Sequence, residues 1–237
     1  MTWQFEITGD AWVLSQLSEA LQSDDIKLLS SNATFSLVGR VFDGITNERE
    51  ARSIAEEKLS RLSGLAMLTL QLRSPLQIKS VTHIDDSGHA KSYITTVHVA
   101  TIETHMSCIV TDAQGNVMAK DPSPESLRTS FNLTGLDKSV DKVLRLLGDD
   151  DLSWVNLYRL YEIVRDDIGG EKAIVSRGWC QPEDLRLFRW TANHPEASGD
   201  AARHGSRSES APKQPMELSQ AQTIIKTMVQ KWLRAKN

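Results

Sequence analysis

The chain has 237 residues, of which 40% are hydrophobic and 24% charged, and its formal net charge is −4. This is ordinary globular composition for one large domain or two small ones, and it carries no global basic field of the kind that announces nucleic-acid binding. Only two cysteines are present, Cys108 and Cys180, which argues against a disulfide framework and against a four-ligand zinc site.

The first half of the chain mixes strand-like alternation with helical spacing. Trp3, Phe5 and Ile7 alternate with polar residues, as in a half-buried strand. Helices are predicted over residues 12–21 and 48–62, the second ended by Ser63-Gly64. Strands are predicted over residues 3–7, 26–29, 34–42, 66–72, 76–84 and 91–110, with turns at 85–88 and 112–115. We therefore expect a small mixed sheet with helices on one face.

The second half of the chain favours helix almost throughout. Residues 119–136 contain Pro122, Pro124 and Gly135 and are predicted to be a linker. Helices are predicted over residues 152–168, 171–175, 182–193 and 219–234, the last with a capping box of Ser219 and Gln222. The predicted fold class is α+β, with an N-terminal mixed β-sheet domain over residues 1–136 and an all-helical bundle over residues 137–237.

Two Arg/His pairs lie close together in the helical part. Arg189 and His194 are five positions apart, with Asn193 between them as a candidate binding residue. Arginine is suited to holding phosphate, and histidine exchanges protons near neutral pH. The pair therefore suits phosphodiester cleavage or phosphate binding. The alternative is structural: Pro195 biases His194 away from helical geometry, so that His194 ends a helix and Arg189 is a surface residue.

The second pair is Arg203 and His204. Asp200 lies four residues before His204, so on a helix its carboxylate would face the imidazole. Here His204 would be a general acid or base, Arg203 a phosphate clamp and Asp200 an orienting group. The alternative is again structural, because Gly205 would end a helical turn whose dipole favours a histidine cation.

Other chemistry finds little support. His83 and His105 could approach across a hairpin, but no further ligand stands at convincing spacing, so no metal and no cofactor are predicted. The chain contains no Gly-rich phosphate loop, Gly-x-Ser-x-Gly elbow or His-Glu-x-x-His helix. Four tryptophans are interpreted as helix-packing anchors: Trp154, Trp179, Trp190 and Trp232.

The C-terminal part, roughly residues 152–237, resembles the HEPN superfamily of helical domains. The resemblance rests on residues 154–162 and 166–170, then on Thr191-Ala192-Asn193, Gly199-Asp200 and Ala202-Arg203-His204-Gly205, and on the closing helix. It implies a helical bundle that often dimerises. Many such proteins are metal-independent endoribonucleases of bacterial toxin–antitoxin or antiviral defence systems, with an Arg four to six residues ahead of a His.

This chain departs from that pattern. If His204-Gly205 is the family's His-Gly, the expected arginine falls at positions 197–199, which hold Ala, Ser and Gly. Arg203 adjoins the histidine instead. The pair with the expected spacing, Arg189 and His194, has Trp190 where a polar residue is usual.

The resemblance thus implies a bacterial HEPN-like protein that binds RNA or cleaves it without metal, in phage defence or a stress response. The alternative is a non-catalytic, dimerising interaction module or scaffold with a protein partner. Residues 152–237 hold 13 Lys and Arg against 10 Asp and Glu, a mild basic excess. The apolar face of the last helix predicts a homodimer. No signal peptide or membrane-spanning stretch is recognised, so a cytoplasmic location is expected.

Overall fold

The structure is a computed structural model, and it describes residues 2–94, 122–149, 151–198 and 210–237. The chain divides into two compact units, Met1–Asn132 and Leu133–Asn237. The sequence pattern placed the change slightly later, between residues 136 and 137. Within the described ranges, none of the helices combines the length and the apolar run needed to cross a bilayer.

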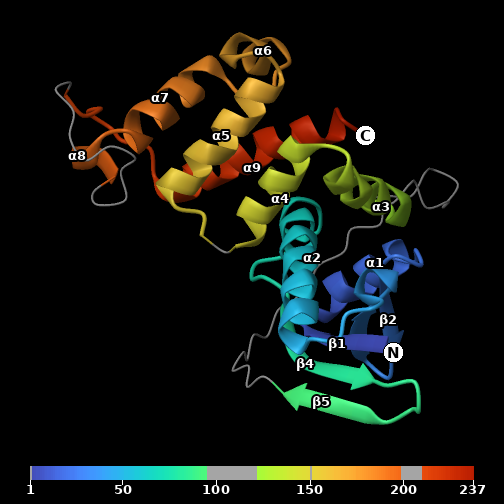
Figure 1. The fold of residues 1–237 in the computed structure, drawn as a ribbon. Coiled ribbons are helices and arrows are strands. Elements are labelled where there is room, and N and C mark those ends of the chain that lie inside the picture. The colour runs from blue at the N-terminus through green and yellow to red at the C-terminus, as the bar shows by residue number, and fades with distance from the viewer. Residues whose placement is uncertain (1, 95–121, 150, 199–209) are drawn as a thin grey trace, which may run out of the picture. The chain divides into compact units, whose positions relative to one another are not determined.

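The N-terminal unit contains a five-stranded sheet in the order β2-β3-β1-β4-β5 (Figure 1). All its described ladders are antiparallel, where the sequence predicted a mixed sheet. The strands are β1 (Thr2–Thr8), β2 (Lys27–Ser31), β3 (Thr34–Val38), β4 (Gln77–Ile84) and β5 (Ala90–Ile94). The unit is α+β, as predicted.

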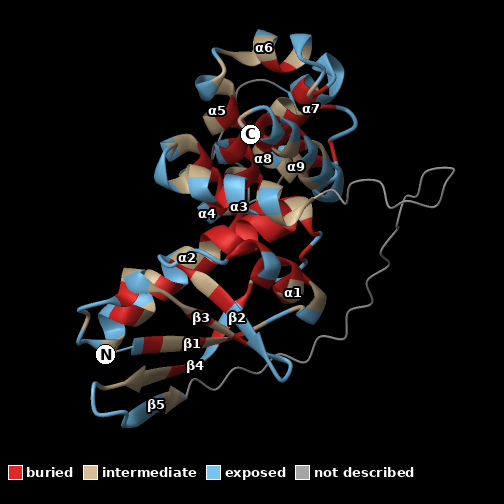
Figure 2. Ribbon diagram, turned by 90° about the vertical axis from the view of Figure 1, so that its right-hand side faces the viewer, coloured by how far each residue is buried: buried red, intermediate tan, exposed pale blue. Residues whose placement is uncertain are grey.

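Burial alternates along the central strand β1, as Figure 2 shows. Trp3, Phe5 and Ile7 point to the buried face, and Phe5 pairs with Leu37 on β3 and Val81 on β4. The helices α1 (Ala11–Ala20) and α2 (Glu48–Thr69) cover that face. A strand with one buried face needs this period of two, which is why the sequence pattern located β1 correctly.

Helix α2 continues past the predicted stop. Ser63 and Gly64 are buried inside it, and the helix ends only at Thr69, so the predicted strand over residues 66–72 is wrong. The Ser63 hydroxyl accepts a hydrogen bond from the Leu76 N–H (3.0 Å), so this serine joins two segments and does not end the helix. The chain turns at Gln71, which has φ +59°. Residues 40–42, predicted as strand, form a 3₁₀ turn, η1 (Arg40–Phe42).

The predicted linker over residues 119–136 is wrong where the structure describes it. Helix α3 (Pro124–Asn132) buries Leu127 and Phe131, and the 3₁₀ turn η2 (Leu133–Gly135) follows. The Ser123 hydroxyl accepts from the Ser126 N–H (3.2 Å), and proline at the first position of a helix is favourable. Ser123 and Pro124 therefore start a helix and do not mark a linker.

The C-terminal unit is entirely helical where it is described. Its helices are α4 (Lys138–Gly148), α5 (Trp154–Asp167), α6 (Glu171–Ser176), α7 (Pro182–Ala192), α8 (Pro195–Ser198) and α9 (Leu218–Arg234). Helix α5 packs against α4, α6, α7 and α9. Tyr158 and Tyr161 of α5 contact Phe188 of α7, and Trp154 stacks on the same ring. Three aromatic anchors on one helix make α5 the core of the unit.

Two details of the helical unit differ from expectation. Helix α4 was not singled out, although Asp137 caps it by accepting from the N–H groups of Ser139 and Val140. The capping box of α9 is formed by Glu217 and Gln220, so the predicted Ser219–Gln222 box is wrong. Of the predicted tryptophan anchors, Trp154 and Trp232 are buried, whereas Trp179 and Trp190 are half-buried.

Candidate functional site

The structure describes three of the six predicted site residues. Arg189, Asn193 and His194 lie at the C-terminal end of α7 and in the turn after it. Asp200, Arg203 and His204 lie outside the described residues, as does His105. The second Arg/His pair therefore stays a prediction from sequence.

Arg189 pairs with a carboxylate of its own unit. Its Nη1 donates to the Glu171 Oε2 at the start of α6, and the Tyr161 hydroxyl donates to the same oxygen (2.8 Å). The three side chains come from α5, α6 and α7, so the cluster ties three helices together. An arginine that already has a carboxylate partner offers less charge to a phosphate.

Burial and the Glu171 carboxylate together raise the pKa of Tyr161 far above its ordinary value of 10.0. The buried tyrosine is therefore neutral in the folded protein, and its proton remains on the hydrogen bond to Glu171.

We expect Tyr161→Phe to flatten the alkaline loss of stability. Above about pH 10 the unfolded chain gives up the Tyr161 proton that the folded chain keeps, so the wild-type free energy of unfolding falls as pH rises. Near neutral pH the variant loses one hydrogen bond, about 1 kcal/mol. Urea unfolding at several pH values between about pH 7 and pH 11 measures both effects. Tyr93→Phe is the control, because Tyr93 has no carboxylate partner within the described residues. An equally steep fall in Tyr161→Phe would contradict the assignment.

His194 is 2% exposed and lies in the turn between α7 and α8. Its Nδ1 accepts from the Glu196 N–H (3.3 Å), and its carbonyl accepts from the N–H groups of Ala197 and Ser198. It thus ends α7 and starts α8, which is the structural alternative raised from Pro195. A general base must reach a substrate proton, and in this conformation the His194 ring is buried.

Asn193 is also buried, at 4% exposure. Its Nδ2 donates to the Arg189 carbonyl (2.7 Å), while its Oδ1 has no hydrogen-bond partner among the described residues. Arg189 reaches toward α6, whereas His194 bonds to the first turn of α8. Arg189 and His194 therefore contact different helices.

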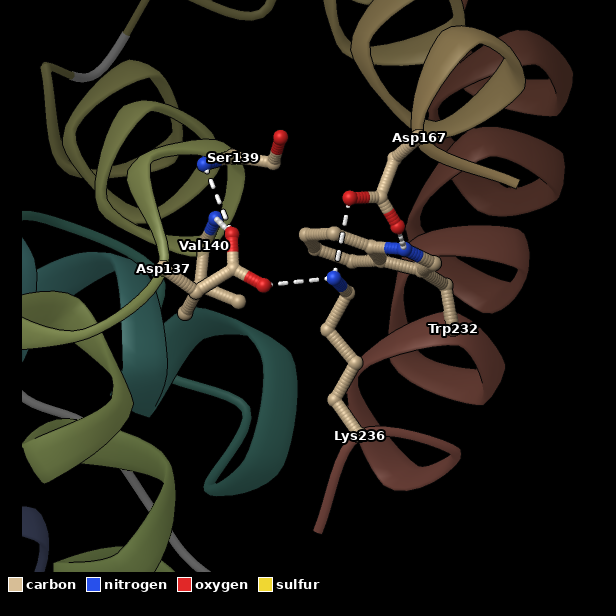
Figure 3. A network of polar contacts seen from close by, with 6 residues as sticks. All are labelled: Asp137, Ser139, Val140, Asp167, Trp232 and Lys236. Atoms are coloured by element: carbon tan, nitrogen blue, oxygen red, sulfur yellow. Dashed lines mark hydrogen bonds and ion pairs between the residues drawn. The ribbon is translucent and has the colours of Figure 1, made fainter. Parts of the chain in front are cut away.

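A polar network that the sequence did not predict joins the start of α4 to the ends of α5 and α9 (Figure 3). The Lys236 ammonium bonds to Asp137 (2.5 Å) and to Asp167 (2.9 Å) and lies 5.1 Å from the centre of the Trp232 ring. The Trp232 Nε1 donates to the second Asp167 oxygen (2.8 Å). Burial acts to raise the pKa of Asp137, but Lys236 and the helix N–H groups hold it below its usual value. The only sequence signal was the aspartate ahead of α4.

A hollow of about 280 Å³ lies beside this network, where α5, α6 and α9 end. It is lined by Asp167, Ile168, Arg177, Trp179, Trp232, Ala235 and Lys236. A second hollow, of about 380 Å³, lies between α7 and α9 and includes Leu187 and Ile224. Among described residues no three His, Cys, Asp or Glu side chains gather as a metal site requires. His83, considered as a ligand from sequence, stacks on Trp3 at 4.3 Å.

Searches of protein-family models, curated proteins and solved structures found no match to this chain.

Proposed function

We propose that this chain binds RNA through its helical unit and does not cleave it with Arg189 and His194. The proposal that these two residues do not cleave RNA rests on their placement. Arg189 pairs with Glu171, and His194 is buried between α7 and α8. RNA as the ligand is supported by the HEPN resemblance and by the basic excess of residues 152–237. A role in bacterial defence or stress remains part of this proposal.

The homodimer expected from the apolar face of the last helix also stays a proposal. Ile225, Met228 and Val229 of that face are buried, and α9 packs along α5 of the same unit. A second copy would therefore have to use another surface of the helical unit, since this face already has an intramolecular partner.

The test uses the full chain and a fluorescein-labelled single-stranded oligoribonucleotide in EDTA. We expect salt-sensitive binding by fluorescence anisotropy and intact RNA on a denaturing gel. Arg189→Ala and His194→Ala should lower the melting temperature, because the first removes the ion pair between α7 and α6 and the second removes the hydrogen bond to the first turn of α8.

His204→Ala and Arg203→Ala are the decisive variants for catalysis. Cleavage that survives EDTA and disappears in both variants would replace the proposal by a metal-independent ribonuclease. No RNA binding by a well-folded wild type would leave the protein-interaction module as the function.

A further inference from the structure

The most distinctive surface outside the predicted site is the turn that ends α6. Residues 176–179 read Ser-Arg-Gly-Trp. Gly178 has φ +66°, its N–H bonds to the Val175 carbonyl (2.9 Å), and the Trp179 N–H bonds to the Ile174 carbonyl (3.1 Å). These two bonds around a left-handed glycine are the Schellman pattern of a helix end. The sequence therefore fixes the backbone that presents Arg177 and Trp179.

Arg177 and Trp179 form a stacked, charged pair. The guanidinium carbon lies 5.1 Å from the indole centre, within cation–π range. Arg177 is exposed, and no carboxylate pairs with it in the described part of the chain. This distinguishes it from Arg189, which Glu171 neutralises. An arginine plane held on an indole, with no acid partner, is a platform on which a further planar ring stacks.

A second cation lies beside the same turn. The Lys231 ammonium of α9 donates to the Gly178 carbonyl (2.8 Å), and Lys231 is otherwise exposed. An ammonium has three donors, so two remain for a ligand. Arg177 and Lys231 thus place two positive charges at this turn, and Arg177 also lines the hollow.

The part of the lining at the ends of α5 and α9 has a different character. The C-cap residues of α5 and α9, Ile168 and Ala235, both line it. Helix C-termini present carbonyl oxygens and partial negative charge. Asp167 and Lys236, also in the lining, already bind each other. These helix ends therefore suit hydrogen-bond donors such as amino groups, while anionic groups belong beside Arg177 and Lys231.

The volume limits the ligand further. At about 280 Å³ the hollow lies just below the usual range of ligand sites, which span roughly 300–1,000 Å³. One planar ring system with a short attachment fits such a space. A nucleotide unites the three required features: a planar ring, an amino edge and a phosphate.

We propose that the hollow bounded by Arg177, Trp179 and the ends of α5 and α9 binds a nucleobase. The base stacks on Arg177, its amino edge faces the helix ends, and its phosphate lies near Arg177 and Lys231. A free nucleotide and an unpaired base of RNA share this chemistry. The second source rests on the proposed RNA-binding function; the first does not.

The test is calorimetric titration of the full chain with AMP, adenosine and inorganic phosphate separately. We expect AMP to bind more tightly than adenosine, and inorganic phosphate not to bind. Arg177→Ala and Trp179→Leu should each weaken AMP about tenfold, and Arg177→Lys, which keeps the charge but loses the plane, should weaken it nearly as much. Arg186→Ala is the matched control, an exposed arginine on α7 outside the lining, and should bind like wild type.

The results separate the two sources and the two proposals. If Arg177→Ala weakens both RNA binding and AMP binding, the ligand is an RNA base. If Arg177→Ala weakens AMP binding and leaves RNA binding unaltered, the ligand is a free nucleotide. RNA binding by wild type without any AMP or adenosine binding overturns this inference and leaves the proposed function standing. Phosphate binding that equals AMP binding, or AMP binding that Arg177→Ala leaves unchanged, overturns it as well. Melting curves of each variant confirm that the helical unit is folded.

Discussion

We expect Trp232→Ala to lower the free energy of unfolding of the helical unit by about 3–5 kcal/mol, the range for removing a large aromatic side chain from a core. Trp232 is 1% exposed, and its Nε1 donates to Asp167 (2.8 Å). The substitution leaves a cavity, removes the ring under the Lys236 ammonium and takes a hydrogen bond from a carboxylate. Urea unfolding followed by far-ultraviolet circular dichroism measures the loss.

Two further variants separate these contributions. Trp232→Phe keeps an aromatic ring but loses the N–H, so it should be destabilised less than Trp232→Ala. Trp179→Ala is the matched control, since this tryptophan belongs to the same unit but is only half-buried. Equal losses for Trp232→Ala and Trp179→Ala would contradict the assignment of Trp232 to the core.

Gly39→Ala should destabilise the N-terminal unit by about 3 kcal/mol or more, through backbone strain and steric overlap. Gly39 has φ +156° and ψ +168°, a combination that is essentially restricted to glycine. A Cβ atom there would lie 2.2 Å from the Asp25 carbonyl oxygen and 2.8 Å from the Ile26 Cα. These are backbone atoms, and the bonds from the Arg40 and Val41 N–H groups to this segment hold it in place.

Gly44→Ala is the control for Gly39→Ala. Gly44 has φ +77°, but a Cβ there meets nothing within 4 Å. We expect about 1 kcal/mol from the left-handed conformation alone. Thermal unfolding of the two variants compares strain without overlap to strain with overlap. A Gly39→Ala protein as stable as Gly44→Ala would show that the Asp25 segment yields at little cost.

The sequence alone located most of the elements that have one buried face. The alternation of Trp3, Phe5 and Ile7 predicted β1, and the apolar stripe of Ile225, Met228 and Val229 predicted α9. These patterns succeed because burial on one side imposes a period of two on strands and of 3.6 on helices. The α+β class and the helical second half followed from the same periodicities.

Local stop signals were less informative. Ser63-Gly64 predicted the end of α2, yet tertiary packing buries both residues inside the helix. Pro124 predicted a linker, yet it starts α3, whose Leu127 and Phe131 are buried. Propensities of this kind amount to about 1 kcal/mol, and burial of several apolar side chains exceeds them.

For the candidate site, too, the sequence determined some features and the tertiary structure decided others. The sequence determined which residues could hold phosphate or move a proton, and it fixed the Arg177–Trp179 turn through the helix-ending glycine between them. Only the tertiary structure decided that Glu171 forms an ion pair with Arg189, that His194 is buried, and that Lys236 binds Asp137 and Asp167. Asp137 and Lys236 are 99 positions apart, and such pairings depend on how helices pack, which no local pattern encodes.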